Sequence, residues 1–156
     1  MKLDLEPALA AGGGGTEMSS EVRRLILVAL GEQTLSFADV LVAEILLVER
    51  SYILPLPFYG SAVLGVIHHQ GGVVPLVSLR RALGESAAVL PERLTAVRLT
   101  ELAPDGLAGM GLVVDRLVGS VSVEDLTKFP AVTYVPAASV LARLAPNLWQ
   151  PQRWAA

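Results

Sequence analysis

The sequence predicts a single, mostly β domain with only short pieces of helix. Short apolar runs recur along the chain, turn residues separate them, and little of the sequence has helical periodicity. The chain has 156 residues, of which 53% are hydrophobic and 17% are charged. It is therefore long enough to bury a core and too apolar to be disordered. Many short strands with tight turns favour small barrels or a sandwich.

The N-terminal residues 1–21 are expected to form a flexible tail, because the glycines at 12–15 have no side chains to pack. Residues 22–156 would then form one domain. The tail lacks a continuous apolar segment, so it does not predict a signal peptide. The most apolar stretch, 40–48, is too short to cross a membrane and contains Glu44.

Two hairpins are predicted in the first half of the domain. The apolar run 25–30 meets a Gly-Glu-Gln turn and is followed by a second short strand. The run 40–48 is ambiguous. Its β-branched residues favour a strand, whereas Asp39 could cap a short helix. The runs 62–67 and 73–77 flank a turn at 68–72 and predict the second hairpin, in which Pro75 needs an edge or bulge position.

The second half continues the same pattern. Residues 79–83 are expected to be helical, with Ser78 as the N-cap and Gly84 ending the helix. The runs 94–102 and 107–114 predict a third hairpin that turns at the Ala-Pro-Asp-Gly of 103–106. A short strand follows at 117–123, and Asp115 before it is expected to accept backbone hydrogen bonds. A last short helix is predicted within 137–144.

Composition argues against nucleic-acid binding and against an enzyme. The net charge of −3 provides no basic surface for nucleic acid, and the absence of cysteine excludes disulfides and thiolate metal sites. His68 and His69 are adjacent, so on a strand they point to opposite faces and make no chelating pair. Ser61 lies outside a Gly-x-Ser-x-Gly elbow. A small hydrolase or metal-dependent enzyme is the least favoured alternative, and no cofactor is predicted.

Three segments carry a family resemblance. The segment PLPFYGSAVLGVIHHQGGVVPLVSLR, residues 55–80, resembles the signature of CheW-like domains. Upstream, Asp39, Val42, Glu44 and Ile45 resemble that family's Asp-x-x-Val-x-Glu-Ile segment, and GLVVDRLVGSVSV at 111–123 resembles its apolar-Val-Asp-x-Val strand. The segments occur in the family's order and at about its spacing, so together they are specific.

The resemblance implies two intertwined five-stranded, SH3-like barrels and a cytoplasmic, non-enzymatic adaptor recruited to membrane-associated receptor arrays. Such adaptors couple the cytoplasmic tips of methyl-accepting chemoreceptors to a CheA-type histidine kinase, in chemotaxis or in twitching motility. Carried over by motif position, the kinase-binding residues are Val42, Glu44 and Gly65, and the receptor-binding residues are Gln70, Val97 and Ser120.

Each of these positions also has a plainer interpretation. Val42 is more often a core residue, and Gly65 is typical of a close approach between two backbones. Glu44 lies within an apolar run, so we expect it to face solvent or a partner, together with Gly65 on one exposed surface.

The sequence also departs from the family pattern. Gln70 stands where the family usually has arginine, which removes a charge and a bidentate donor. The C-terminal end looks shortened, so either the last strand is missing or a divergent tail replaces it. A second hypothesis is therefore a degenerate CheW-fold subunit that binds the kinase but not receptors.

Overall fold

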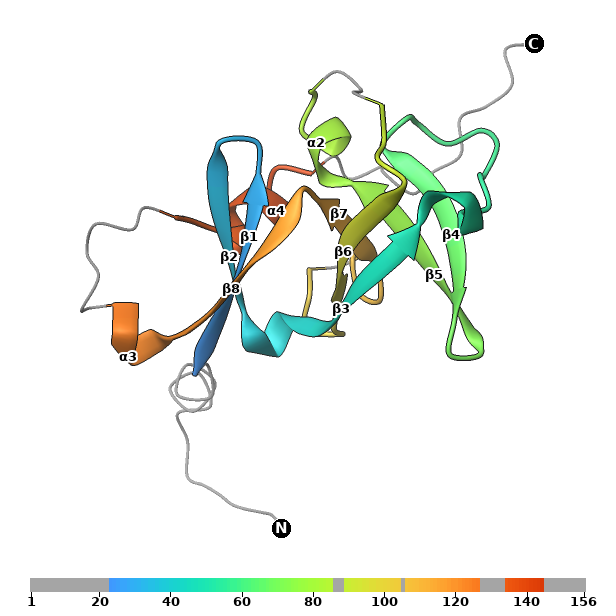
Figure 1. The fold of residues 1–156 in the computed structure, drawn as a ribbon. Coiled ribbons are helices and arrows are strands. Elements are labelled where there is room, and N and C mark those ends of the chain that lie inside the picture. The colour runs from blue at the N-terminus through green and yellow to red at the C-terminus, as the bar shows by residue number, and fades with distance from the viewer. Residues whose placement is uncertain (1–22, 86–88, 105, 127–133, 145–156) are drawn as a thin grey trace.

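The computed structural model describes residues 23–85, 89–104, 106–126 and 134–144. Two β-sheets lie side by side, as the labelled strands of Figure 1 show. The strands are β1 (Arg24–Leu30), β2 (Gln33–Ala38), β3 (Val42–Glu49), β4 (Val63–His69), β5 (Gly72–Ser78), β6 (Arg93–Leu99), β7 (Gly111–Val114), β8 (Arg116–Ser122) and β9 (Val135–Pro136). The helices are η1 (Asp39–Leu41), η2 (Arg50–Tyr52), α2 (Leu79–Ala82), α3 (Val123–Leu126) and α4 (Ala137–Leu141). The predicted tail and the last residues, 145–156, lie outside the described residues.

The first sheet has the strand order β8-β1-β2-β9. The predicted hairpin forms its centre, where β1 and β2 pair in antiparallel register from Leu25↔Ala38 to Leu30↔Gln33. The two-residue strand β9 pairs in parallel with β2. Among the described residues this sheet therefore has four strands, one fewer than the five that the family resemblance implies.

The second sheet has five strands in the order β3-β6-β7-β5-β4. All of them come from one continuous part of the chain between β2 and β8. The chain thus leaves the first sheet after β2, builds the whole second sheet, and returns to pair β8 with β1. This path makes the two sheets intertwined, as predicted.

The turn between β4 and β5 is tighter than the sequence predicts. Gln70 and Gly71 alone form it, with φ angles of 50° and 79°, as the two central residues of a type I′ turn require. His68 and His69 therefore belong to β4, where they pair with Val73 and Gly72.

Strand β5 has neighbours on both sides in the strand order, but at Pro75 it is unpaired on the side toward β7, so the predicted edge position is found locally. Pro75 is accommodated opposite Val66, whose own N–H and C=O bond to Leu54 instead of β5. The ladder between β5 and β7 begins only after Pro75, at Leu76.

The third hairpin has shorter strands and a longer connection than predicted. Strand β6 ends at Leu99, and β7 begins at Gly111. Thr100 turns away to η1, where its N–H and Oγ1 donate to the carbonyls of Leu41 and Val40. Residues 107–110, predicted as the start of the second strand of this hairpin, form a loop instead. This loop places the buried side chains of Leu107 and Met110 in the core.

Two of the three described α-helices, α2 and α4, were predicted from the sequence. Ser78 caps α2 by accepting a hydrogen bond from the Arg81 N–H, and α4 lies within the predicted range. The ambiguous run at 40–48 begins with η1 and continues as β3, so the strand interpretation holds for most of it. Helix α3 was not predicted, although Ser122 and Asp125 are spaced as an N-cap pair and the Asp125 N–H donates to Ser122 Oγ.

Two clusters of buried side chains form the core. The larger contains Leu35, Phe37 and Leu112, and the smaller packs Leu46 and Leu76 inside the second sheet. Strand β7 serves both, because Leu112 and Val114 join the larger cluster while Val113 joins the smaller. Alternate residues of one strand thus hold the two sheets together.

Candidate protein-docking site

Glu44 on β3 is held by two side chains from neighbouring strands. Its Oε2 accepts hydrogen bonds from Arg98 Nη2 at 2.7 Å and Nε at 2.8 Å, and its Oε1 lies 3.0 Å from His69 Nε2. The hydrogen bonds from Arg98, and next those from His69, hold the pKa of Glu44 below its usual value. The expectation that Glu44 faces solvent or a partner is therefore wrong in part, because its charge is neutralised within the chain.

The Glu44 cluster lies where β3 and β4, the two outer strands of the second sheet, face each other without pairing. Between them is a cavity of about 330 Å³, lined by residues 44–49 of β3, Tyr52, and residues 67–69 of β4. We call this gap the seam. Two large apolar side chains line it in exposed positions, Leu47 with 78% of its surface accessible and Tyr52 with 72%.

Gly65 lies inside the fold rather than on the exposed surface that we expected. Its φ angle is +141°, and a Cβ atom built there would be 2.2 Å from the Leu54 carbonyl oxygen. The close contact arises because Leu54 and Val66 exchange two backbone hydrogen bonds of 2.9 Å. The geometry thus matches the plainer interpretation, an approach of two backbones that only glycine permits. Val42 is half-buried and packs against the larger core cluster.

The structure does not gather the three predicted receptor-binding residues on one surface. Gln70 is exposed at the turn between β4 and β5. Val97 has 0% of its surface accessible, so its side chain cannot touch a partner docked on the folded domain. Ser120 is exposed on β8 of the first sheet, where its Oγ accepts a hydrogen bond of 2.8 Å from Arg24.

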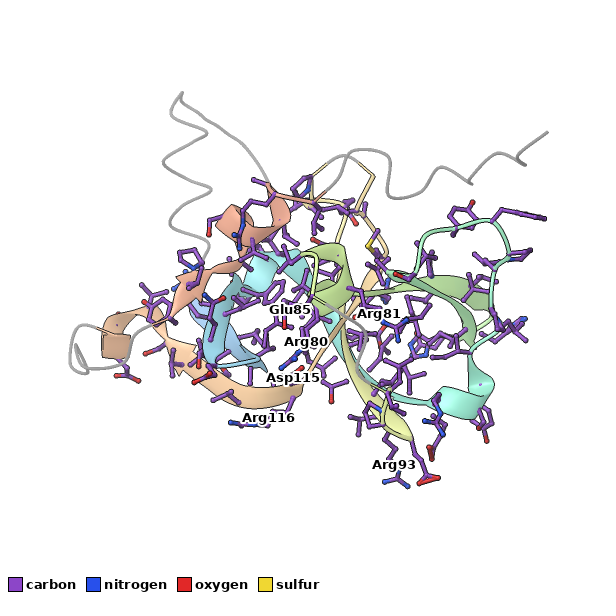
Figure 2. The ribbon with its side chains drawn as sticks, turned by 90° about the horizontal axis from the view of Figure 1, so that it is seen from above. Arg80, Arg81, Glu85, Arg93, Asp115 and Arg116 are labelled. Atoms are coloured by element: carbon purple, nitrogen blue, oxygen red, sulfur yellow. The ribbon has the colours of Figure 1, made fainter. Side chains whose placement is uncertain are left out.

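A second charged cluster joins the two sheets (Figure 2). Asp115 receives hydrogen bonds from Arg80 Nε and Nη2, at 2.9 and 2.8 Å, and from the Gly31 N–H at 2.8 Å. Gly31 lies in the turn of the first sheet, and Arg80 lies on α2 beside the second. Burial opposes ionisation of Asp115, but these hydrogen bonds outweigh it and keep its pKa below the usual value. The predicted backbone bond to Asp115 is confirmed, whereas Arg80 as its partner was missed.

Beside this cluster lies a cavity of about 350 Å³ with an apolar floor. Its lining includes Leu90, Leu94 and Val113, with Arg80, Arg81 and Arg93 at its polar side. Within the described ranges, no group of three histidine, cysteine, aspartate or glutamate side chains could hold a metal ion. No helix in the described part of the chain is long and apolar enough to cross a membrane.

Comparison with known proteins agrees with this architecture. The CheW-like domain family matches residues 24–138, which include all the strands that the structure describes. The chain belongs to the CheW-like domain family. Its predicted fold class, mostly β with a CheW-like arrangement of two sheets, is confirmed. A search of curated proteins finds no match.

Among solved structures, the chain is similar to the scaffolding protein TtCheW from Thermoanaerobacter tengcongensis, with a TM-score of 0.52 and 17% identity. The match covers 65% of this chain and 65% of the TtCheW chain. At this identity, the likeness shows a CheW-like fold and leaves partners to be inferred from the residues themselves.

Proposed function

We propose that the protein is a non-enzymatic adaptor that couples chemoreceptors to a CheA-type histidine kinase on the cytoplasmic side of a receptor array. Membership in the CheW-like family supports a scaffold role. The observation that carries the proposal is the exposed pair Leu47 and Tyr52 beside the seam. Large apolar side chains that are exposed beside the same cavity, here one from β3 and one from η2, are typical of a protein-docking surface.

The kinase would dock on β3, and the three carried-over residues would support that surface from within. Glu44 ties β3 to β4 and β6 through His69 and Arg98. Gly65 allows the Leu54 backbone to lie against β4, and Val42 anchors the start of β3 on the core. In this arrangement the contact itself is made by Leu47 and Tyr52.

Binding of the purified kinase to two aspartate variants tests this proposal. Leu47→Asp adds a charge that must be desolvated on docking, so we expect at least tenfold weaker binding. Val123→Asp is the matched control, because Val123 is also an exposed apolar residue but lies on α3. The proposal fails if the parent does not bind the kinase, or if Leu47→Asp binds as tightly as the parent.

A kinase-binding module without receptor contact is the second candidate function. It is favoured by the neutral Gln70 at the exposed turn and by the complete burial of Val97. Restoring the charge with Gln70→Arg should raise affinity for a receptor tip several-fold at low salt, and less at high salt because exposed charges are screened. If the parent already binds the receptor tip, and Gln70→Arg changes nothing at either salt concentration, this candidate is excluded.

A further inference from the structure

We propose that the seam between β3 and β4 accepts an extended segment of the kinase's regulatory domain as an added β-strand. This inference rests on the proposed docking of the kinase and specifies how the contact is made. Its basis is the direction of the backbone hydrogen-bonding groups on both strands that border the seam.

On β3, every second residue directs its backbone groups into the seam. The Arg50 N–H donates to the Glu92 carbonyl at 2.7 Å, in the register that pairs Glu49 with Arg93. Hydrogen-bonded and non-bonded pairs alternate along an antiparallel ladder. Counting back from Arg50, the N–H and C=O groups of Ile45, Leu47 and Glu49 therefore point away from β6 and toward β4.

On β4, the same argument applies to His68. Val66 exchanges both of its backbone bonds with Leu54, so its N–H and C=O point away from β5. His68, two residues further along, has the same orientation and also faces the seam. Among the described residues, no hydrogen bond uses these seam-facing groups of Ile45, Leu47, Glu49 and His68.

The chain itself shows what the seam can hold. Leu54 already pairs with the outer edge of β4 at Val66, as a single residue of an added strand. Between Leu54 and the contact of Glu44 with His69 the seam is open, and a strand inserted there needs about 10 Å between its two neighbours. Glu44 and His69 cross the gap only through their side chains, which meet at 3.0 Å. The backbones are thus separated by two side chains and one hydrogen bond.

The exposed side chain in the middle of β3 indicates the chemistry of the added segment. Outer strands usually carry charged residues or proline that prevent further pairing. Leu47, in contrast, exposes 78% of its surface, and Tyr52 lines the same cavity. The segment would therefore be extended, with its backbone bonding to β3 and β4 and an apolar side chain packed on Leu47 and Tyr52.

Residue-resolved hydrogen exchange of the full chain, alone and with the kinase's regulatory domain, tests the inference. The amides of Ile45, Leu47, Glu49 and His68 should exchange rapidly in the free protein and at least tenfold more slowly in the complex. The Val48 amide, which faces β6, is the internal control and should be protected in both. Binding without protection of the seam amides overturns strand addition and leaves the proposed function standing. No binding at all refutes the proposed function, and strand addition with it.

Two variants of Leu47 separate the backbone contact from the side-chain contact. Leu47→Ser removes the apolar side chain but keeps the N–H, whereas Leu47→Pro keeps a smaller apolar ring and removes the N–H. Proline is tolerated on an outer strand where the N–H faces outward. If the N–H donates to the added strand, Leu47→Pro should bind the kinase about tenfold more weakly than Leu47→Ser. Equal affinities for the two variants contradict the inference.

Discussion

Replacing Gly65 with alanine adds one methyl group where the backbone of β4 lies against the carbonyl of Leu54. The new Cβ would be 2.2 Å from that oxygen and 2.9 Å from Ile53 Cγ2. The oxygen belongs to the backbone, so it cannot rotate aside as the end of a side chain would. The bridge between Leu54 and Val66 must therefore open.

Two terms contribute to the free energy that this substitution costs. The φ angle of +141° is one that residues with a side chain rarely adopt, and such strain costs about 1–3 kcal/mol. Opening the bridge removes two backbone hydrogen bonds, each with a net contribution of about 0.5–1.5 kcal/mol. Together they predict a loss of about 4 kcal/mol in the free energy of unfolding.

Urea denaturation of Gly65→Ala and of a matched glycine variant measures this loss. With a slope of about 2 kcal/mol per molar urea, the midpoint should fall by about 2 M. Gly72→Ala is the control, because a Cβ there would meet only the His69 carbonyl oxygen at 3.6 Å, an ordinary contact. If the free energy of unfolding of Gly65→Ala lies within about 1 kcal/mol of the parent's, the backbone contact does not require glycine, and this explanation of Gly65 is wrong.

Three further predictions concern the charged clusters and the core. The pKa of Asp115 is lowered by folding, so this carboxylate stabilises the protein above its unfolded pKa of about 4 and the stability is lost as the pH falls below that value. Urea midpoints measured between pH 3 and 7 should therefore fall less for Asp115→Asn than for the parent. Arg98→Gln should raise the pKa of Glu44, measured by carboxyl NMR titration, more than His69→Gln does, and the reverse order would contradict the geometry. Phe37→Ala, at a position with 0% exposure, should lower the free energy of unfolding by about 3–5 kcal/mol, and a loss below about 1 kcal/mol would remove Phe37 from the core.

Local signals in the sequence predicted much of the fold. Glycine after an apolar run marks the first turn at Gly31, and Ser78 with Gly84 brackets α2 as expected. These features depend on a few neighbouring residues, so the sequence contains them directly. The prediction of a strand beginning at Leu107 was wrong for the same reason. An apolar loop that packs into the core has the same composition as a strand, so local composition does not distinguish them.

The contacts of the candidate site could not be predicted in this way, because they depend on the register between distant strands. Glu44 meets Arg98 because β3 pairs with β6, and His69 because β4 faces β3 across the seam. The burial of Gly65 likewise depends on Leu54 returning to β4. A family motif identifies such positions without saying which of them touch a partner and which hold the surface in place.

The path of the chain between the two sheets has a consequence for folding on the ribosome. All five strands of the second sheet are available once Val114 has emerged, because their partners all lie within residues 42–114. The hairpin of β1 and β2 emerges first but must wait for β8, which pairs Arg24 with Ser122. Closing so long a loop is slow and entropically costly unless its ends are brought together. If the second sheet folds first, it shortens that loop. The apolar face around Phe37 would then stay uncovered in the nascent chain until β7 and α4 pack against it.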